Sequence, residues 1–149
     1  MKTILSIAFI LFSSLHLEAS EQKKSLKYMN IEQAVNSKQA ASILDSDIKF
    51  YFPKQEHPEV SKTIIIAKSQ RAINVTFKFG AQACIAAFLE TLKALQDTAK
   101  EQEADAIINI SSYYNEEQLS SETSYLCEPG FFVSSVSLKA EVVKIKKQP

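Results

Sequence analysis

The sequence is poor in glycine and has no excess charge of either sign, and each shortage removes a class of function. Two glycines in 149 residues are too few for most loops that cradle phosphate groups. Neither the P-loop motif GxxxxGKS/T nor GxGxxG is present, so a P-loop nucleotide site is excluded. The formal net charge is zero, which argues against a nucleic-acid partner because such a partner requires a basic excess.

The first residues form a pattern typical of a secretion signal. Lys2 supplies a short positive region, and residues 4–15 are almost all apolar or small. This run has the length of a signal-peptide core but is too short to span a bilayer. Leu17 and Ala19 fit the −3 and −1 positions of a cleavage site. We therefore expect residues 1–19 to be a signal peptide.

The expected export decides how the cysteines are interpreted. No cysteine lies near the cleavage site, so no lipid anchor is expected, and no later apolar run approaches a membrane span. We expect the periplasm of a bacterium as the location, with secretion beyond it as an alternative. That compartment is oxidising. The even count of two cysteines, Cys84 and Cys127, then favours a disulfide over two buried free thiols.

Hydrophobic periodicity divides the mature chain into an N-terminal part, 20–47, and a domain, 48–146. The first part reads as a polar arm followed by a short helical segment capped by Asn30. The clearest element is an amphipathic helix over 81–102, with Gln96 among the polar residues off its buried stripe. Strands are expected over 48–52, 63–67, 72–79, 107–110, 121–127 and 136–145.

Connections between these elements predict the fold class. The polar residues 68–71 are expected to be a hairpin loop, and 115–117 a hairpin tip. Glu128-Pro129-Gly130 is a turn signal, with Gly130 at the position of positive φ. Strands joined by short turns pair antiparallel, and one helix with a single apolar stripe needs a sheet to cover. We expect an α+β fold in which a mainly antiparallel sheet packs on one long amphipathic helix.

His57 is the only histidine of the mature chain, so any metal site or Ser-His-acid triad has to use it. Glu56 and Glu59 are the nearest carboxylates, and the three residues lie on a polar loop that contains Pro58. Such a group is more typical of a solvated loop than of a metal site. No serine stands in a GxSxG motif. We expect no cofactor and no catalytic residue; a small hydrolase or metal-dependent protein using His57 is the alternative.

Aromatic and acidic residues near the expected hairpins form a candidate interaction surface. Adjacent residues of a strand point to opposite faces, so one ring of each aromatic pair is expected to point outward. Outward aromatic rings beside an acidic tip suit partner binding; the alternative is that the rings pack over the edge of the helix. The surface would consist of Tyr113, Tyr114, Glu116, Glu117, Phe131 and Phe132.

Charge is balanced overall but not along the chain. Residues 101–128 contain seven acids and no base, whereas 49–78 contain six bases and two acids. This segregation can produce a two-faced surface that docks a partner. We favour the other interpretation, in which neighbouring strands neutralise each other.

The long helix, the run ADAIINISSYY over 104–114 and the later Cys127 resemble a group of small exported bacterial proteins. These proteins carry the label of an excinuclease ATPase, the nucleotide-hydrolysing part of the ABC excinuclease, and the likeness extends from Ile31 to Ile145. An ATPase needs a P-loop, which this chain lacks. The resemblance therefore implies an uncharacterised exported protein rather than a nucleotide hydrolase.

The chain is also similar in outline to the RcsF envelope-stress lipoproteins and to YbjQ-like domains. In RcsF, a cysteine near the start of the helix pairs with one in the later hairpin, and Cys84 and Cys127 stand at matching places. This resemblance implies the same disulfide. A lipid-anchor cysteine and a second disulfide pair are missing here, so neither a sensor role nor a metal site is carried over.

These observations predict a non-enzymatic binding or interaction protein of the bacterial cell envelope. Its partner would be an envelope protein or a small ligand, with no nucleic acid and no membrane anchor. A secreted effector is a further alternative.

Overall fold

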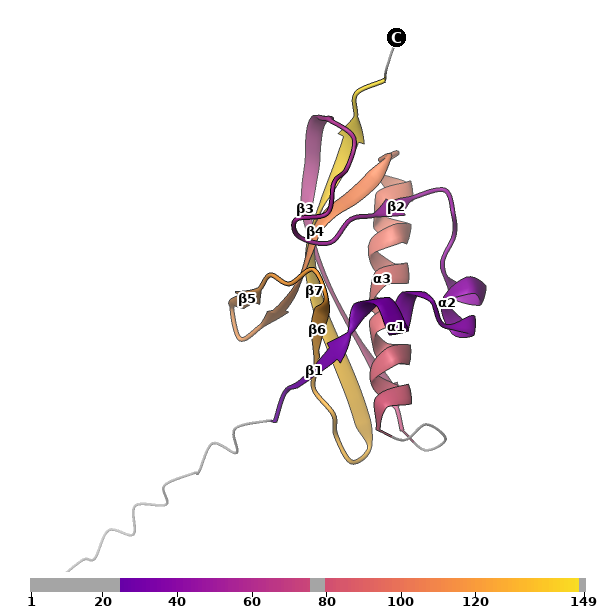
Figure 1. Cartoon of the computed structure of the whole chain (residues 1–149), viewed down its shortest axis with the longest axis vertical. Coiled ribbons are helices and arrows are strands. Elements are labelled where there is room, and N and C mark those ends of the chain that lie inside the picture. Colours follow the sequence, from indigo (N-terminus) through magenta and orange to yellow (C-terminus); the bar gives the residue numbers. More distant parts are fainter. Residues whose placement is uncertain (1–24, 76–79, 148–149) are drawn as a thin grey trace, which may run out of the picture.

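The computed structural model describes residues 25–75 and 80–147 (Figure 1). The expected signal peptide, 1–19, and the start of the expected arm lie outside the described residues. The α+β class with a mainly antiparallel sheet is confirmed. The elements are β1 (Lys27–Asn30), α1 (Ile31–Val35), α2 (Lys38–Ile43), β2 (Lys49–Phe50), β3 (Val60–Asn74), α3 (Ala81–Glu101), β4 (Ala106–Tyr114), β5 (Glu117–Leu119), β6 (Ser124–Cys127) and β7 (Val133–Ile145).

The main sheet has the strand order β2-β4-β7-β3, with β5 paired to the end of β4. All of its pairs are antiparallel except β2–β4, which is parallel. The chain passes through β3 and α3 between β2 and β4, which is a connection long enough for a parallel pair. α3 packs on one face of this sheet, against β3 and β7 (Figure 1).

The core lies between α3 and the sheet. β7 alternates as its sequence predicts, with Val136, Leu138, Ala140 and Val142 buried. From the helix, Phe88, Leu92 and Leu95 are buried against them, together with smaller residues that allow close approach. Burial of this apolar surface is the main stabilising contribution to the fold. Among the described residues, no helix is long and apolar enough to cross a membrane.

β3 is one continuous strand, so the expected hairpin loop at 68–71 is wrong. Lys68 and Arg71 pair with Lys139 and Val136 of β7 within an unbroken register. β3 is the edge strand of the sheet, and several of its side chains therefore remain in solvent. A polar run at an edge thus resembles a loop in the sequence. Residues 76–79, the end of the strand expected over 72–79, lie outside the described residues.

A second, two-stranded sheet joins the N-terminal part to the domain. β1 pairs antiparallel with β6, from Lys27 opposite Cys127 to Asn30 opposite Ser124. The sequence did not predict β1, which falls where the polar arm was expected to end. α1 and α2 follow and lie over α3 (Figure 1). The segment is therefore tied to the domain through both β6 and α3.

Gly130 has a different role from the one expected. Its φ is not positive; among the described glycines only Gly80 has a positive φ, of 55°. A Cβ atom on Gly130 would instead lie 2.2 Å from the carbonyl oxygen of Val133. Gly130 is thus required for the close approach of two backbone segments between β6 and β7.

Candidate ligand-binding groove

A groove of about 580 Å³ lies beside α1. This volume lies within the range of about 300–1,000 Å³ typical of small-ligand sites. We name it the α1 groove. It is lined by residues from α1, from the α2–β2 loop, from β2 and the turn after it, and from the β5–β6 loop: Asn30, Ile31, Glu32, Val35, Asn36, Leu44, Asp45, Ser46, Ile48, Lys49, Phe50, Phe52, Gln55, Glu122 and Thr123.

The floor of the α1 groove is apolar and rests on an aromatic stack. Ile31, Ile48 and Phe52 line it and are buried. The ring of Phe52 stacks on Phe88 of α3, with ring centroids 6.3 Å apart, and Phe88 stacks on Tyr125 of β6 at 3.9 Å. Three elements thus support one surface, which favours a floor that keeps its shape when a ligand binds.

The start of α1 forms one wall of the groove. Asn30 caps the helix, with its Oδ1 accepting a hydrogen bond from the Gln33 N–H at 2.8 Å. The Ile31 N–H donates to the Thr123 carbonyl at 2.9 Å. This second bond fixes the β5–β6 loop against α1, so Glu122 and Thr123 form the adjoining wall.

Gln96 of α3 holds the opposite wall, although the helical pattern placed it on the polar face. Its side chain is fully buried. Its Oε1 accepts from the Asp45 N–H at 2.9 Å, and its Nε2 donates to the carbonyls of Asp45 at 2.8 Å and Ile48 at 3.3 Å. One side chain therefore satisfies three backbone groups of the α2–β2 loop. The expectation that Gln96 lies off the buried stripe is wrong because this loop returns to cover it.

The rim of the α1 groove is more acidic than basic. Glu32, Asp45 and Glu122 line it against Lys49 alone. Asp45 forms an ion pair with Lys100, and the hydrogen bond and charge of Lys100 hold the pKa of Asp45 below its usual value. The same hydrogen bond raises the pKa of Lys100. The side chains of Glu32 and Glu122 form no ion pair within the described chain, so their charges face solvent and the groove.

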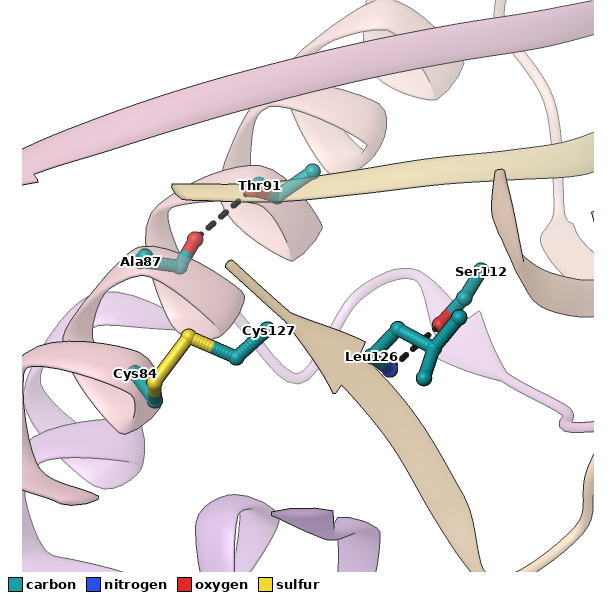
Figure 2. The surroundings of a disulfide bond; sticks show 6 residues. All are labelled: Cys84, Ala87, Thr91, Ser112, Leu126 and Cys127. Carbon is teal, nitrogen blue, oxygen red and sulfur yellow. Dashed lines mark hydrogen bonds between the residues drawn. A yellow bond between two sulfur atoms is a disulfide. The ribbon is translucent and has the colours of Figure 1, made fainter. Parts of the chain in front are cut away.

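The cysteines form the expected disulfide, with 2.00 Å between the Sγ atoms of Cys84 and Cys127. Figure 2 shows how it ties the start of α3 to β6. Next to it, the Leu126 N–H donates to Ser112 Oγ at 2.8 Å, which joins β6 to β4. β6 is therefore fixed to both layers of the core, to α3 by the disulfide and to β4 by the bond to Ser112. Within α3, Thr91 Oγ1 donates to the Ala87 carbonyl at 2.6 Å.

The residues expected to form an interaction surface are not brought together. Tyr113, Tyr114, Glu116 and Glu117 lie on the β4–β5 hairpin, which extends from the side of the sheet (Figure 1). The segment that contains Phe131 and Phe132 lies just before the start of β7, apart from the β4–β5 hairpin (Figure 1).

The four aromatic rings also differ in exposure. Phe131 and Phe132 are 87% and 74% exposed, so both rings of this pair point outward and not only one. They lie in a loop, where the alternation of a strand does not apply. Tyr113 and Tyr114 are half-buried. The hydroxyl of Tyr113 accepts a hydrogen bond from Lys68 Nζ at 3.1 Å.

His57 lies on the exposed loop between β2 and β3. Its ring packs edge-on against Tyr51, with centroids 5.6 Å apart, and its Nδ1 lies 2.9 Å from the Pro58 carbonyl oxygen. In the part of the chain that the structure describes, no three His, Cys, Asp or Glu side chains gather as metal ligands. His57 does not line the α1 groove.

The charged residues of the two stretches have partners on other strands. Asp105 of the acidic stretch pairs with Lys144 of β7, at 3.4 Å. Lys68 of the basic stretch donates a hydrogen bond to the hydroxyl of Tyr113. β7 lies between β3 and β4 in the sheet, so these two strands are not direct neighbours, whereas β2 of the basic stretch pairs with β4.

Comparisons with known proteins found no match to a family model, a curated protein or a solved structure. The α1 groove was also missed by the sequence analysis, because its walls come from four segments that no local pattern connects. The only sequence signal for it was the Asn30 cap, which marks the start of α1.

Proposed function

We propose that the chain is an exported, non-enzymatic binding protein of the bacterial cell envelope that holds the apolar part of a ligand in the α1 groove. The observation that carries this proposal is a groove of about 580 Å³ whose floor is formed by the apolar residues Ile31, Ile48 and Phe52 and whose rim is polar. A concave site that is apolar inside and has a few polar groups at its edge is typical of ligand sites.

The disulfide supports export. Cys84 and Cys127 are both buried and bonded to each other, which is typical of proteins that fold in an oxidising compartment. Cell fractionation with an antibody against the mature chain tests the location. Recovery from the periplasmic fraction is expected, and recovery from the cytoplasm alone would contradict it. Recovery from the culture medium would favour the secreted effector instead.

The rim charges select the kind of ligand. Glu32 and Glu122 come from different walls and both face the groove without an ion-pair partner in the described chain. Asp45 is engaged by Lys100 and is less available. A ligand with an apolar chain and a positively charged end would bury the chain on the floor and meet the two carboxylates. An anionic end would be repelled by the same groups.

A pair of probes that differ only in head-group charge tests this selection. Octyltrimethylammonium and octyl sulfate, both below their micellar concentrations, are titrated into the mature protein by isothermal calorimetry. The ammonium probe is expected to bind about tenfold more tightly than the sulfate, which corresponds to about 1.4 kcal/mol. Equal binding of the two probes would contradict the role of the carboxylates, and binding of neither would contradict the groove as a ligand site.

Two variants localise the effect. E32Q/E122Q removes both charges from exposed side chains and is expected to abolish the preference for the ammonium probe. E101Q/E117Q is the matched control, because it also removes two charges and because Glu101 at the end of α3 and Glu117 of β5 are exposed glutamates that do not line the groove. The control is expected to keep the preference. If E101Q/E117Q lowered it as much as E32Q/E122Q, the preference would reflect net charge alone.

A further inference from the structure

β3 is an edge strand of the main sheet. It is the longest strand, Val60–Asn74, and stands at the end of the order β2-β4-β7-β3. Its only strand partner among the described residues is β7. The backbone groups of an edge strand are available to pair with another chain.

The edge is irregular at one end and regular at the other. Irregularities in the pairing with β7 fall between Val60 and Lys62 and between Thr63 and Ile65. From Ile65 to Asn74 the register is unbroken and the strand contains no proline. Bulges twist an edge away from a partner strand, whereas a regular stretch offers a continuous row of donors and acceptors. The usable edge is therefore 65–74.

This edge carries positive charge and no negative charge. Lys68 and Arg71 are exposed, and no acid occurs in β3. Lys68 stands opposite Lys139 of β7; the one acid of β7 in this register, Glu141 opposite Ile66, accepts a hydrogen bond from Asn109 at 2.7 Å. Lys68 Nζ lies 4.2 Å from the centre of the Tyr113 ring, which orients the ammonium without neutralising it. None of these three basic side chains forms an ion pair with another described residue.

The charges argue against a second copy of the same chain as the occupant. If two β3 strands paired antiparallel over the full length of 65–74, Ile65 would face Asn74 and Lys68 would face Arg71 of the other copy. Both charged pairs would then be repulsive, because like charges directly opposite each other destabilise a sheet. A strand with carboxylates at these positions would instead gain two attractive pairs.

We propose that the edge of β3 over 65–74 binds an extended, acidic segment of a partner protein as an added strand. Main-chain hydrogen bonds would supply affinity, and Lys68 and Arg71 would select carboxylates on the two faces of the added strand. This surface is formed by other residues than the α1 groove, so either site can fail its test without affecting the other.

A fluorescein-labelled nonapeptide that repeats glutamate, valine and threonine is the probe, and fluorescence anisotropy is the measurement. Glutamates three residues apart lie on opposite faces of a strand, as Lys68 and Arg71 do. We expect the peptide to bind the mature protein with an affinity that falls as salt is added. The same repeat with lysine in place of glutamate is expected not to bind. Equal binding of the two peptides would overturn the proposed charge selection.

K68E/R71E is expected to weaken binding of the glutamate peptide at least tenfold. K68Q/R71Q, which only removes the charges, is a second variant in case the reversal affects folding; circular dichroism checks both. K38E/K54E is the matched control, because both lysines are exposed and lie outside β3. An equal loss of binding in the control would overturn the assignment to β3.

A third peptide separates strand addition from simple charge attraction. It has the same side chains as the glutamate peptide, but all of its backbone nitrogens are methylated, so it can donate no main-chain hydrogen bond. Its binding is expected to be at least tenfold weaker, and unchanged binding would overturn strand addition.

Analytical ultracentrifugation tests whether a second copy of the chain occupies the edge of β3. A dimer that dissociates in K68E/R71E would show that it does and would also overturn the proposal.

Discussion

Removing the Cys84–Cys127 disulfide tests how the scaffold of the groove is stabilised. The bond closes a loop with a sequence separation of 43 residues. In the chain-entropy model, a cross-link over a loop of this size destabilises the unfolded state by about 4 kcal/mol at 25 °C. C84A/C127A is therefore expected to lower the free energy of unfolding by about 4 kcal/mol. This is a large share of the about 5–15 kcal/mol that is typical of a small domain.

Urea unfolding followed by circular dichroism measures the change. The m-value is expected to increase in C84A/C127A, because the unfolded chain without the cross-link exposes more surface. Reductant serves as the control: it should lower the stability of the wild-type protein toward that of the variant and leave the variant unchanged. A loss below about 1 kcal/mol with an unchanged m-value would refute the argument that the disulfide acts on the unfolded chain.

Two further substitutions act on buried polar groups. Q96A removes three hydrogen bonds to the backbone of Asp45 and Ile48; it is expected to cost about 3 kcal/mol in urea unfolding and to weaken probe binding in the α1 groove. Unchanged stability would contradict the role of Gln96. The buried Tyr125 hydroxyl has no hydrogen-bond partner in the described chain, so Y125F is expected to stabilise the fold by about 1 kcal/mol. Burial raises the pKa of Tyr125 above the usual 10.0. As the pH rises above about 10, the Tyr125 hydroxyl therefore ionises first in the unfolded state, which binds fewer protons than the folded state. The free energy of unfolding of the wild-type protein is then expected to fall by up to about 1.4 kcal/mol per pH unit. Y125F should lack this contribution to the fall, and an identical pH profile would contradict it.

Periodicity predicted the parts of the fold in which one face of an element is buried and the other is not. In β7 the alternation of Val136, Leu138 and Ala140 with polar residues follows directly from its two faces. The same reasoning failed for β3, because an edge strand is solvated on more than one side and Lys68 to Arg71 resemble a loop. The cysteine pairing was predictable because count and compartment restrict it more than local geometry does.

Features that depend on distant segments could not be predicted from the sequence. β1 is a strand only because β6, almost one hundred residues later, supplies its partner. Gln96 appears as a surface residue in the helical pattern, yet the α2–β2 loop folds over it. The α1 groove combines both effects, since its walls come from α1, β2 and the β5–β6 loop. Pairing between remote segments leaves no periodic signal in either one.

The most direct test of the α1 groove is to map where the ammonium probe binds. Octyltrimethylammonium is titrated into the isotopically labelled mature protein, and backbone amide shifts are followed by NMR. We predict that the largest shifts occur at 30–36, 44–50 and 122–123, around the floor of Ile31 and Ile48. Shifts that cluster instead at the exposed Phe131 and Phe132, or that spread evenly over the surface, would contradict the account.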